Sequence, residues 1–312
     1  MKHPPAYIWR MDPVSILTAG LVDYAGLFPP AGLPMRAALE NYASYFNRAD
    51  AASLGRFIVA VERIDELEVA ASDLFPPTGD ARPWKISVLA NADVESVLAR
   101  VQAFNAEHQS ADGNEAIVDA LEIKFDLLGE LEASDIFRTH SLNVFVELPL
   151  DDELENRIAA IHMAGAFAKV RTGGVTPTAF PAGADVVRFL RECCRAGVAF
   201  KATAGLHHPL RGTYPLTYEE GCGSAAMFGF LNVFLGAALM WAGADDAVVS
   251  RLIDETDPDS LSFGDDAITW REEVITAGTI QQARRYFATS FGSCSFREPV
   301  DELKSLMSAA HR

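Results

Sequence analysis

The sequence predicts an α/β fold, a (β/α)8 (TIM) barrel with a helical insertion, and three observations support this prediction. Eight candidate strands alternate with stretches of helical spacing along the chain. The 312 residues, 49% of them hydrophobic, can bury a large core and exceed the about 250 residues that such a barrel typically needs. No run rich in proline, glycine and serine marks a linker, so we expect a single domain over residues 1–312. A doubly wound open sheet is the alternative fold.

The candidate strands are short apolar runs separated by turns and helical segments. In chain order they are residues 21–28, 56–63, 84–90, 120–126, 143–149, 167–174, 200–208 and 287–295. Apolar residues three and four apart share one helix face after Asn91 and after Asp151, the expected starts of two helices. The extra length falls between the seventh and eighth strands. We expect a helical insertion at about 212–285, with a small hairpin in ITWREEVIT at 268–276.

Composition argues against several classes of partner and location. The net charge of -17 argues against a nucleic-acid partner, because nucleic-acid binders carry clustered Lys and Arg. The four cysteines, Cys193, Cys194, Cys222 and Cys294, lack paired CxxC spacing and fit a reducing compartment. Residues 1–13 do not resemble an export signal, so we expect a cytoplasmic protein.

The apolar run at 225–242 is long enough to span a membrane and carries no charge. It contains Asn232 and two glycines, and it has no basic flank. We therefore expect a buried helix and no membrane contact. The same apolar helix could instead be buried in a dimer contact, which leaves a homo-oligomer open.

Side-chain alternation directs charged residues of four consecutive strands toward the barrel interior, because one face of each strand must be apolar to meet the helices. In the seventh strand the apolar face includes Phe200 and Ala202, which leaves Lys201 on the opposite face. The polar and charged residues expected inside are Glu122, Lys124 and Asp126 in the fourth strand, Asn143 and Glu147 in the fifth, Lys169, Arg171 and Gly173 in the sixth, and Lys201, Thr203, Gly205 and His207 in the seventh.

This concentration of charge needs an explanation, because barrel interiors are normally filled with branched apolar side chains. Ion pairs that neutralise one another, or an exposed sheet face, would explain it without function. An active site with a lysine nucleophile is the sharper hypothesis. A lysine side chain ordinarily has a pKa of about 10.4, and burial or a cationic neighbour lowers it. Lys169 and Lys201 lie on adjacent predicted strands, so we expect one of them to be the cationic neighbour that lowers the pKa of the other.

A neutral lysine amine adds to an aldehyde or ketone and loses water, and the protonated imine then acts as an electron sink for carbon–carbon cleavage or formation. Such a reaction also needs a group that moves protons. Asp126, Glu122 and His207 are the candidates for this role.

Three short motifs resemble the deoxyribose-phosphate aldolases, class I Schiff-base aldolases on a (β/α)8 barrel. KVRTG at 169–173 is similar to the family's K-x-x-T-G on the sixth strand. FKATAG at 200–205 is similar to F-K-x-x-G-G on the seventh, and FGSCS at 291–295 to FGASS on the eighth. The resemblance implies that Lys169 forms the Schiff base and that Lys201 lowers its pKa. It also implies that Gly205, Gly292, Ser293 and Ser295 lie near a substrate phosphate.

The sequence also departs from this family. The family's fourth strand has an aspartate in a context like E-I-D, whereas EIKFD here puts Lys124 at that position and moves the carboxylate to Asp126. Arg171 replaces a small residue, and its guanidinium can bind a carboxylate in a bidentate manner. The expected substrate-binding residues are Arg171, Thr172, Gly173, Glu147, Thr203, Gly205, His208, Gly292, Ser293 and Ser295.

The sequence thus predicts a Schiff-base lyase that acts on a small aldehyde or oxo acid, phosphorylated or carboxylated, without a cofactor or metal. One alternative is a metal-dependent hydrolase or isomerase that uses His207, His208 and carboxylates. Another is a noncatalytic binding protein, whose pocket would keep the charges but need no reactive lysine. Cys294 is expected to be a packing residue, because the sequence shows no base partner for a nucleophile.

Overall fold

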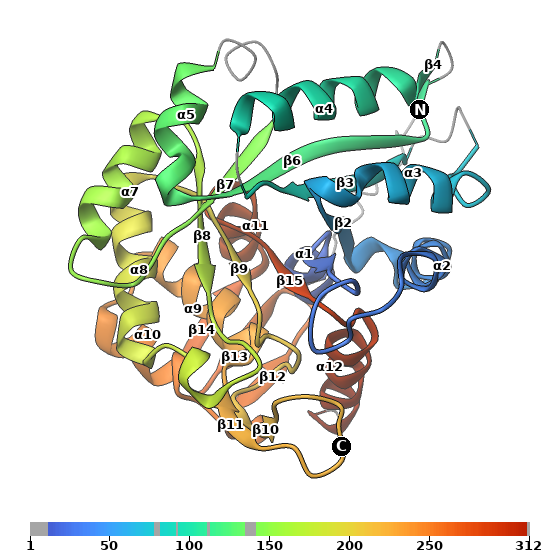
Figure 1. Cartoon of the computed structure of the whole chain (residues 1–312). Helices are drawn as coiled ribbons and strands as arrows, with labels where there is room; N and C mark the ends of the chain where they lie inside the picture. The colour runs from blue at the N-terminus through green and yellow to red at the C-terminus, as the bar shows by residue number, and fades with distance from the viewer. Residues whose placement is uncertain (1–11, 78–81, 92, 111–112, 135–141, 311–312) are drawn as a thin grey trace, which may run out of the picture.

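A closed barrel of eight parallel strands forms the centre of the computed structural model (Figure 1). The structure describes residues 12–77, 82–91, 93–110, 113–134 and 142–310, so the segment considered as an export signal lies largely outside the described residues. The barrel strands are β1 (Val22–Tyr24), β2 (Leu54–Ala60), β3 (Trp84–Leu89), β6 (Ala116–Lys124), β7 (Asn143–Glu147), β8 (Phe167–Arg171), β9 (Phe200–Thr203) and β15 (Ala288–Ser293). They follow one another in chain order around the barrel, and β15 pairs with β1 to close it. The predicted (β/α)8 barrel is confirmed.

Helix α1 (Pro13–Thr18) precedes β1, and the other helices follow barrel strands and cover the outside of the barrel. These are α2 (Met35–Phe46), α3 (Ile64–Ala71), α4 (Val94–Glu107), α5 (Leu128–Ala133), α7 (Leu154–Met163), α8 (Gly183–Ala196) and α12 (Arg297–Ala310). The predicted apolar faces of α4 and α7 are buried. Their starts differ from the prediction: α4 is capped by Asp93, whose side chain accepts from the Ser96 N–H, and Glu153 precedes α7. The Glu153 side chain makes no capping bond, whereas Asp151 accepts from the Glu153 N–H at 3.0 Å just before α7 begins.

The insertion between β9 and β15 contains the expected helices and also two small sheets. Its elements are β10 (Gly212–Pro215), β11 (Ser224–Met227), α9 (Phe230–Trp241), α10 (Asp246–Ile253), β12 (Leu261–Phe263), β13 (Ala267–Trp270), β14 (Glu273–Thr276) and α11 (Ala277–Tyr286). The predicted hairpin at 268–276 is confirmed, because β13 pairs antiparallel with β14. The sequence analysis missed β10, β11 and β12, which are short and flanked by polar loops.

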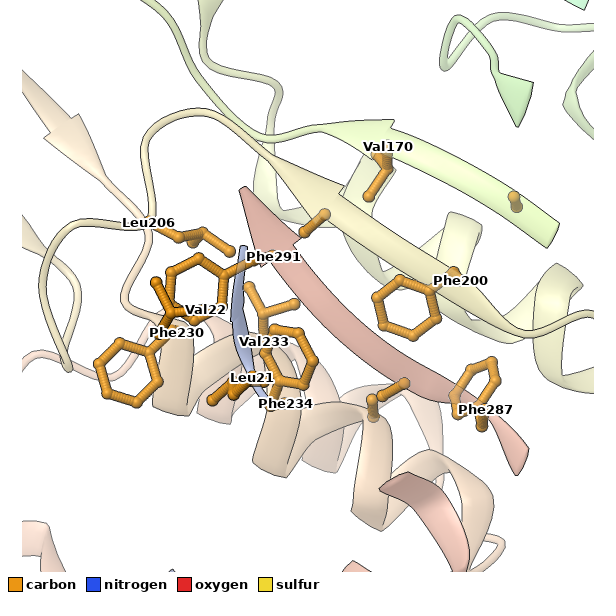
Figure 2. Packing of buried hydrophobic residues seen from close by; sticks show 14 of the residues in the cluster. Leu21, Val22, Val170, Phe200, Leu206, Phe230, Val233, Phe234, Phe287 and Phe291 are labelled. Carbon is orange, nitrogen blue, oxygen red and sulfur yellow. The ribbon is translucent and has the colours of Figure 1, made fainter. Parts of the chain in front are cut away.

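The predicted buried helix is confirmed for Phe230–Trp241, which form α9, whereas the first residues of the apolar run belong to strand β11. Figure 2 shows Phe234 of α9 between aromatic side chains of two barrel strands. Its ring centroid lies 6.1 Å from that of Phe200 and 5.8 Å from that of Phe291. Among the described residues, every helix is too short or too polar to cross a bilayer. Helix α9 thus serves as an apolar wall behind β9 and β15.

All eight barrel strands end earlier than predicted, and at two of them the early end affects the expected site. Strand β9 stops at Thr203 because Ala204 and Gly205 take left-handed backbone angles, with φ of 62° and 76°. Strand β6 stops at Lys124, and the chain turns into a 3-10 helix at Phe125–Leu127. Strict alternation of side chains ends where the strand ends. Alternation therefore no longer determines which side chains beyond these points face inward.

One buried amide fixes α9 to its surroundings. Asn232 is fully buried and accepts from the Arg211 N–H at 2.8 Å. Its Nδ2 donates to the carbonyls of Leu252 and Glu255 at 2.7 and 2.8 Å. Three backbone groups from separate segments thus depend on one side chain.

We predict that Asn232→Ala lowers the free energy of unfolding by about 3 kcal/mol, because it leaves those three buried backbone groups unpaired. Urea denaturation measures the change. The matched control is Asn47→Ala, since Asn47 is exposed and donates only within its own helix end. A loss below about 0.5 kcal/mol for Asn232→Ala, no larger than ordinary surface substitutions give, would contradict the proposed anchor.

Candidate active site

Two buried lysines lie on neighbouring strands inside the barrel. Lys169 of β8 pairs in register with Lys201 of β9, and both side chains point inward as predicted. Lys169 is 4% exposed and Lys201 is 0% exposed. An ammonium group in such a place requires anionic partners, because an unpaired buried charge costs several kcal/mol.

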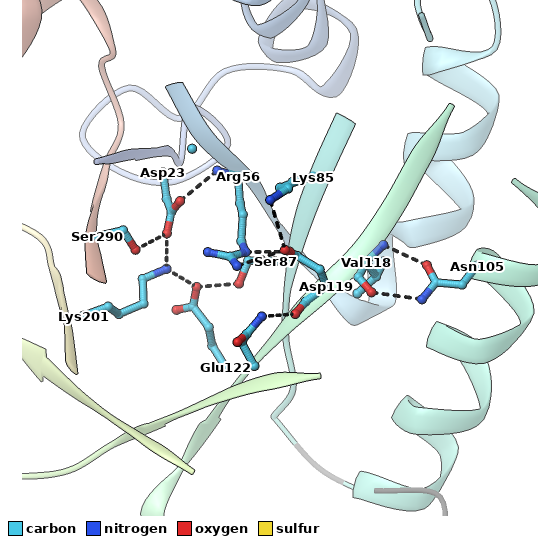
Figure 3. Close-up of polar contacts among 12 residues, drawn as sticks. Asp23, Arg56, Lys85, Ser87, Asn105, Val118, Asp119, Glu122, Lys201 and Ser290 are labelled. Carbon is cyan, nitrogen blue, oxygen red and sulfur yellow. Dashed lines mark hydrogen bonds and ion pairs between the residues drawn. The ribbon is translucent and has the colours of Figure 1, made fainter. Parts of the chain in front are cut away.

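Glu122 of β6 supplies one carboxylate to both lysines. Its Oε1 lies 2.6 Å from Lys201 Nζ, and its Oε2 lies 2.8 Å from Lys169 Nζ. Ser87 of β3 also donates its hydroxyl to Oε1 at 2.7 Å. Figure 3 shows Ser87, Glu122 and Lys201 turned toward one another across the barrel. We call Glu122, Lys169 and Lys201, with the carboxylates of Asp23 and Glu147 described next, the lysine–carboxylate array.

Asp23 of β1 completes the partners of Lys201. Its Oδ2 lies 2.7 Å from Lys201 Nζ and accepts from the Ser290 hydroxyl at 2.8 Å. Its Oδ1 accepts from the Arg56 N–H at 2.7 Å. The sequence analysis gave Asp23 and Ser87 no role. The sequence could have identified Asp23 as a candidate, because it is the single charged residue of the predicted apolar strand at 21–28.

Glu147 of β7 holds Lys169 from the other side. Its Oε2 lies 2.8 Å from Lys169 Nζ, and its Oε1 lies 3.5 Å from the Nε of Arg171. The Glu147 side chain is 23% exposed and the Arg171 side chain 53% exposed. Lys169 therefore has one buried carboxylate partner and one that is partly exposed to solvent.

These contacts determine the pKa of each group. Burial opposes the charge of Glu122, but the two ammonium groups outweigh it and hold the pKa of Glu122 well below its usual value. Burial also opposes the charge of Lys169, but Glu122 and Glu147 outweigh it and raise the pKa of Lys169. The pKa of Lys169 is thus raised and not lowered as expected, because a shared carboxylate lies between the two ammonium groups.

A cavity of about 790 Å³ opens at the carboxyl ends of the strands, above the lysines. In (β/α)8 barrels this end of the strands carries the active site. Of the residues predicted to be at the site, the lining includes Glu122, Lys169, Arg171, Thr203, Gly205, His207, His208 and Gly292. Lys169 thus reaches the cavity, whereas Lys201 lies beneath it among its carboxylate partners.

Two residues predicted in the interior lie elsewhere. Lys124 is the last residue of β6, and Asp126 lies in the 3-10 helix that follows. Both are exposed, and neither lines the cavity. The chain turns at Phe125, so the alternation that placed Asp126 inward no longer applies. Glu122 is the carboxylate of the fourth strand that meets the lysines.

Five predicted substrate-binding residues do not line the cavity. One is Glu147, which pairs with Lys169 and Arg171, and the other four have structural roles. The Thr172 hydroxyl is buried and donates to the Ala204 carbonyl at 2.6 Å. Gly173 packs so closely that a Cβ would lie 2.9 Å from the Cα of Gly205. Ser293 accepts from the Ser295 N–H at 3.3 Å, and Ser295 caps α12 by accepting from the Glu298 N–H at 3.2 Å.

The two histidines each pair with a glutamate of α12. His207 Nδ1 lies 2.8 Å from Glu298 Oε2, and His208 Nδ1 lies 2.8 Å from Glu302 Oε2. The His208 ring also stacks on Tyr214, with centroids 3.5 Å apart. Within the described ranges, no group of three or more His, Cys, Asp or Glu side chains is arranged to hold a metal ion.

The fold and this geometry define a (β/α)8 barrel protein with a buried lysine–carboxylate array at the base of a cavity. No protein-family model and no curated protein matches the sequence. Among solved structures, it is similar to nitroalkane oxidase from Streptomyces ansochromogenes, with 14% identity and a TM-score of 0.32. That match covers 63% of this chain and 61% of the oxidase chain, which is less than two thirds. A likeness this weak carries no argument about function.

We predict that Lys201→Met lowers the free energy of unfolding by about 3–5 kcal/mol, because it leaves buried carboxylates without their cation. Adding Asp23→Asn should recover part of this loss, since one uncompensated charge is then removed. Chemical denaturation measures both variants. The control is Lys85→Met, whose lysine is 57% exposed. If the losses of unfolding free energy of the two single variants simply add in the double variant, Lys201 and Asp23 are not coupled.

Proposed function

We propose that the protein is a class I, Schiff-base lyase that cleaves or forms a carbon–carbon bond in a small carbonyl compound, with Lys169 as the nucleophile. The observation that carries this proposal is the position of Lys169. Its amino group lies at the base of the cavity between two carboxylates: Glu122, which lines the cavity with it, and Glu147, which is outside the lining and whose side chain is 23% exposed. The motif resemblance to deoxyribose-phosphate aldolases supports the same assignment.

Glu147 accepts the proton that Lys169 must lose before it can attack. The two groups are already hydrogen bonded at 2.8 Å, so a direct transfer gives a neutral amine and a neutral carboxylic acid. The amine nitrogen then adds to the substrate carbonyl carbon, and Glu147 returns the proton to the carbonyl oxygen. Loss of water from the carbinolamine gives the protonated imine on Lys169.

The imine then receives the electron pair of the breaking bond. A base removes the proton of the substrate hydroxyl, the carbon–carbon bond breaks, and the first product leaves as an aldehyde or ketone. The remaining enamine takes up a proton at carbon, and water releases it from Lys169 as the second product. Glu122 stays ionised throughout, because its ammonium partners hold its pKa low, and it stabilises the positive charge of the imine.

Arg171 favours an oxo acid over a neutral substrate. Its guanidinium is half exposed at the cavity, next to the Glu147 carboxylate. A substrate carboxylate could bind it in a bidentate manner and would leave Glu147 free to exchange its proton with Lys169. Gly205 and Gly292 also line the cavity, where the absence of side chains leaves room for the substrate.

We predict that borohydride with a panel of aldehydes and oxo acids forms a reduced adduct on Lys169. Peptide mass spectrometry identifies the modified residue. Lys169→Met should abolish the adduct, whereas the exposed-lysine control Lys85→Met should retain it. An adduct on Lys201 would overturn the assignment of Lys169 as the nucleophile. If no adduct forms and the compound binds unchanged, the result favours a binding protein.

We also predict how the adduct depends on pH. Only the neutral amine attacks, so the rate of trapping rises with pH through the pKa of Lys169, which its carboxylate partners raise. Glu147→Gln removes one of these carboxylates, and the midpoint of the profile should move about one pH unit lower. The maximal rate should fall about 100-fold or more, because the proton acceptor is lost. A midpoint that stays or moves upward would contradict the proposed role of Glu147.

A further inference from the structure

A cysteine, a histidine and a glutamate form a second cluster on the cavity wall. His207 follows β9, Cys294 follows β15, and Glu298 lies in the first turn of α12. All three line the same cavity as Lys169. His207 Nδ1 lies 2.8 Å from Glu298 Oε2, and His207 Nε2 lies 4.0 Å from Cys294 Sγ. The imidazole therefore lies between the thiol and the carboxylate.

Tyr218, from the loop between β10 and β11, joins this cluster. Its hydroxyl donates to Glu298 Oε2 at 3.0 Å and lies 3.6 Å from Cys294 Sγ. It also lines the cavity. A hydroxyl close to the sulfur can turn its proton toward a negative oxygen that forms beside that sulfur.

The order of contacts matches that of a cysteine nucleophile with its base. In such a site the imidazole takes the thiol proton, and the carboxylate fixes the ring and stabilises its positive charge. The thiol-to-imidazole distance is long for a hydrogen bond, as is common before a substrate binds. Burial opposes a charge on His207, but its contacts with Cys294 and Glu298 raise the pKa of His207 to about 9, so the neutral ring that can accept the thiol proton predominates only at alkaline pH.

We propose that Cys294 is a nucleophile that accepts an acyl group from an ester or thioester in the cavity, with His207 as its base and Glu298 as a positioning residue. The sulfur attacks the carbonyl carbon, and the thiol proton passes to His207 Nε2. The bond to the leaving group then breaks, and the leaving group takes the proton from the imidazolium. Water, activated by His207, hydrolyses the resulting thioester and restores the thiol.

This site is separate from the Schiff-base chemistry. The acyl transfer needs no amine, and the imine on Lys169 needs no thiol. The sequence analysis considered Cys294 a packing residue because no base partner was visible. The fold supplies that partner from the residues just beyond β9, which are 87 positions away in the chain.

The test is acetylation of the full-length protein by p-nitrophenyl acetate, followed by release of nitrophenolate and by peptide mass spectrometry. We expect a rapid phase that places one acetyl group on Cys294. Cys294→Ser should abolish this phase, and His207→Gln should slow it about 100-fold or more. Glu298→Gln should slow it as well, because the ring loses its orienting partner.

Cys222→Ser is the matched control. Cys222 lines the same cavity, but its thiol donates to the Thr217 carbonyl at 3.2 Å and has no imidazole contact within the described part of the chain. This variant should keep the rapid phase. Acetylation of Cys222 or of lysines with Cys294 unmodified would overturn the proposal, as would an unchanged rate at Cys294 in His207→Gln. Circular dichroism of each variant separates loss of the base from loss of the fold. Neither result depends on borohydride trapping at Lys169.

Discussion

The Glu122 carboxylate, shared by two lysines, is the interaction on which the interior of this barrel depends. Each of its oxygens lies within 2.8 Å of one ammonium group, so the carboxylate separates two charges that would otherwise repel each other inside the barrel. Asp23 and Glu147 then supply the second carboxylate of Lys201 and Lys169. A buried ion network of this kind rarely stabilises a protein more than apolar packing does. A further ion pair lies beside the array, because the Arg56 guanidinium donates to the Asp119 carboxylate at 2.5 and 2.9 Å. The chemical role that we propose therefore rests on the position of Lys169 at the cavity.

The two lysines differ in what surrounds them, and this difference divides their roles. Lys201 is fully buried and held by Asp23 and Glu122, so it acts as a fixed positive charge. Lys169 reaches the cavity and pairs with Glu147, whose side chain is partly exposed. In the mechanism that we propose, the carboxylate that helps to keep Lys169 charged is also the acceptor for its proton.

Much of the fold was predictable from the sequence, because strand and helix periods are local properties of the chain. The eight strands and the inward direction of Glu122, Lys169 and Lys201 followed from alternation. The errors arose where local regularity ends. Asp126 lies past the turn at Phe125, and Ala204 and Gly205 adopt left-handed angles that end β9. The pairing of His207 with Cys294, and the place of Asp23 beside Lys201, depend on strands that meet only when the barrel closes, so no local pattern could reveal them.

The protonation state of Lys169 tests this account most directly. It is measured by pH titration of the Lys169 side-chain signal in the NMR spectrum of protein labelled with ¹³C-lysine. The Lys169→Met variant assigns the signal. Our account predicts that the pKa of Lys169 in the absence of substrate lies above about 10.4, the usual pKa of a lysine side chain. A Lys169 amine that titrates near neutral pH without substrate would contradict it, because the carboxylates would then not control the charge of the lysine.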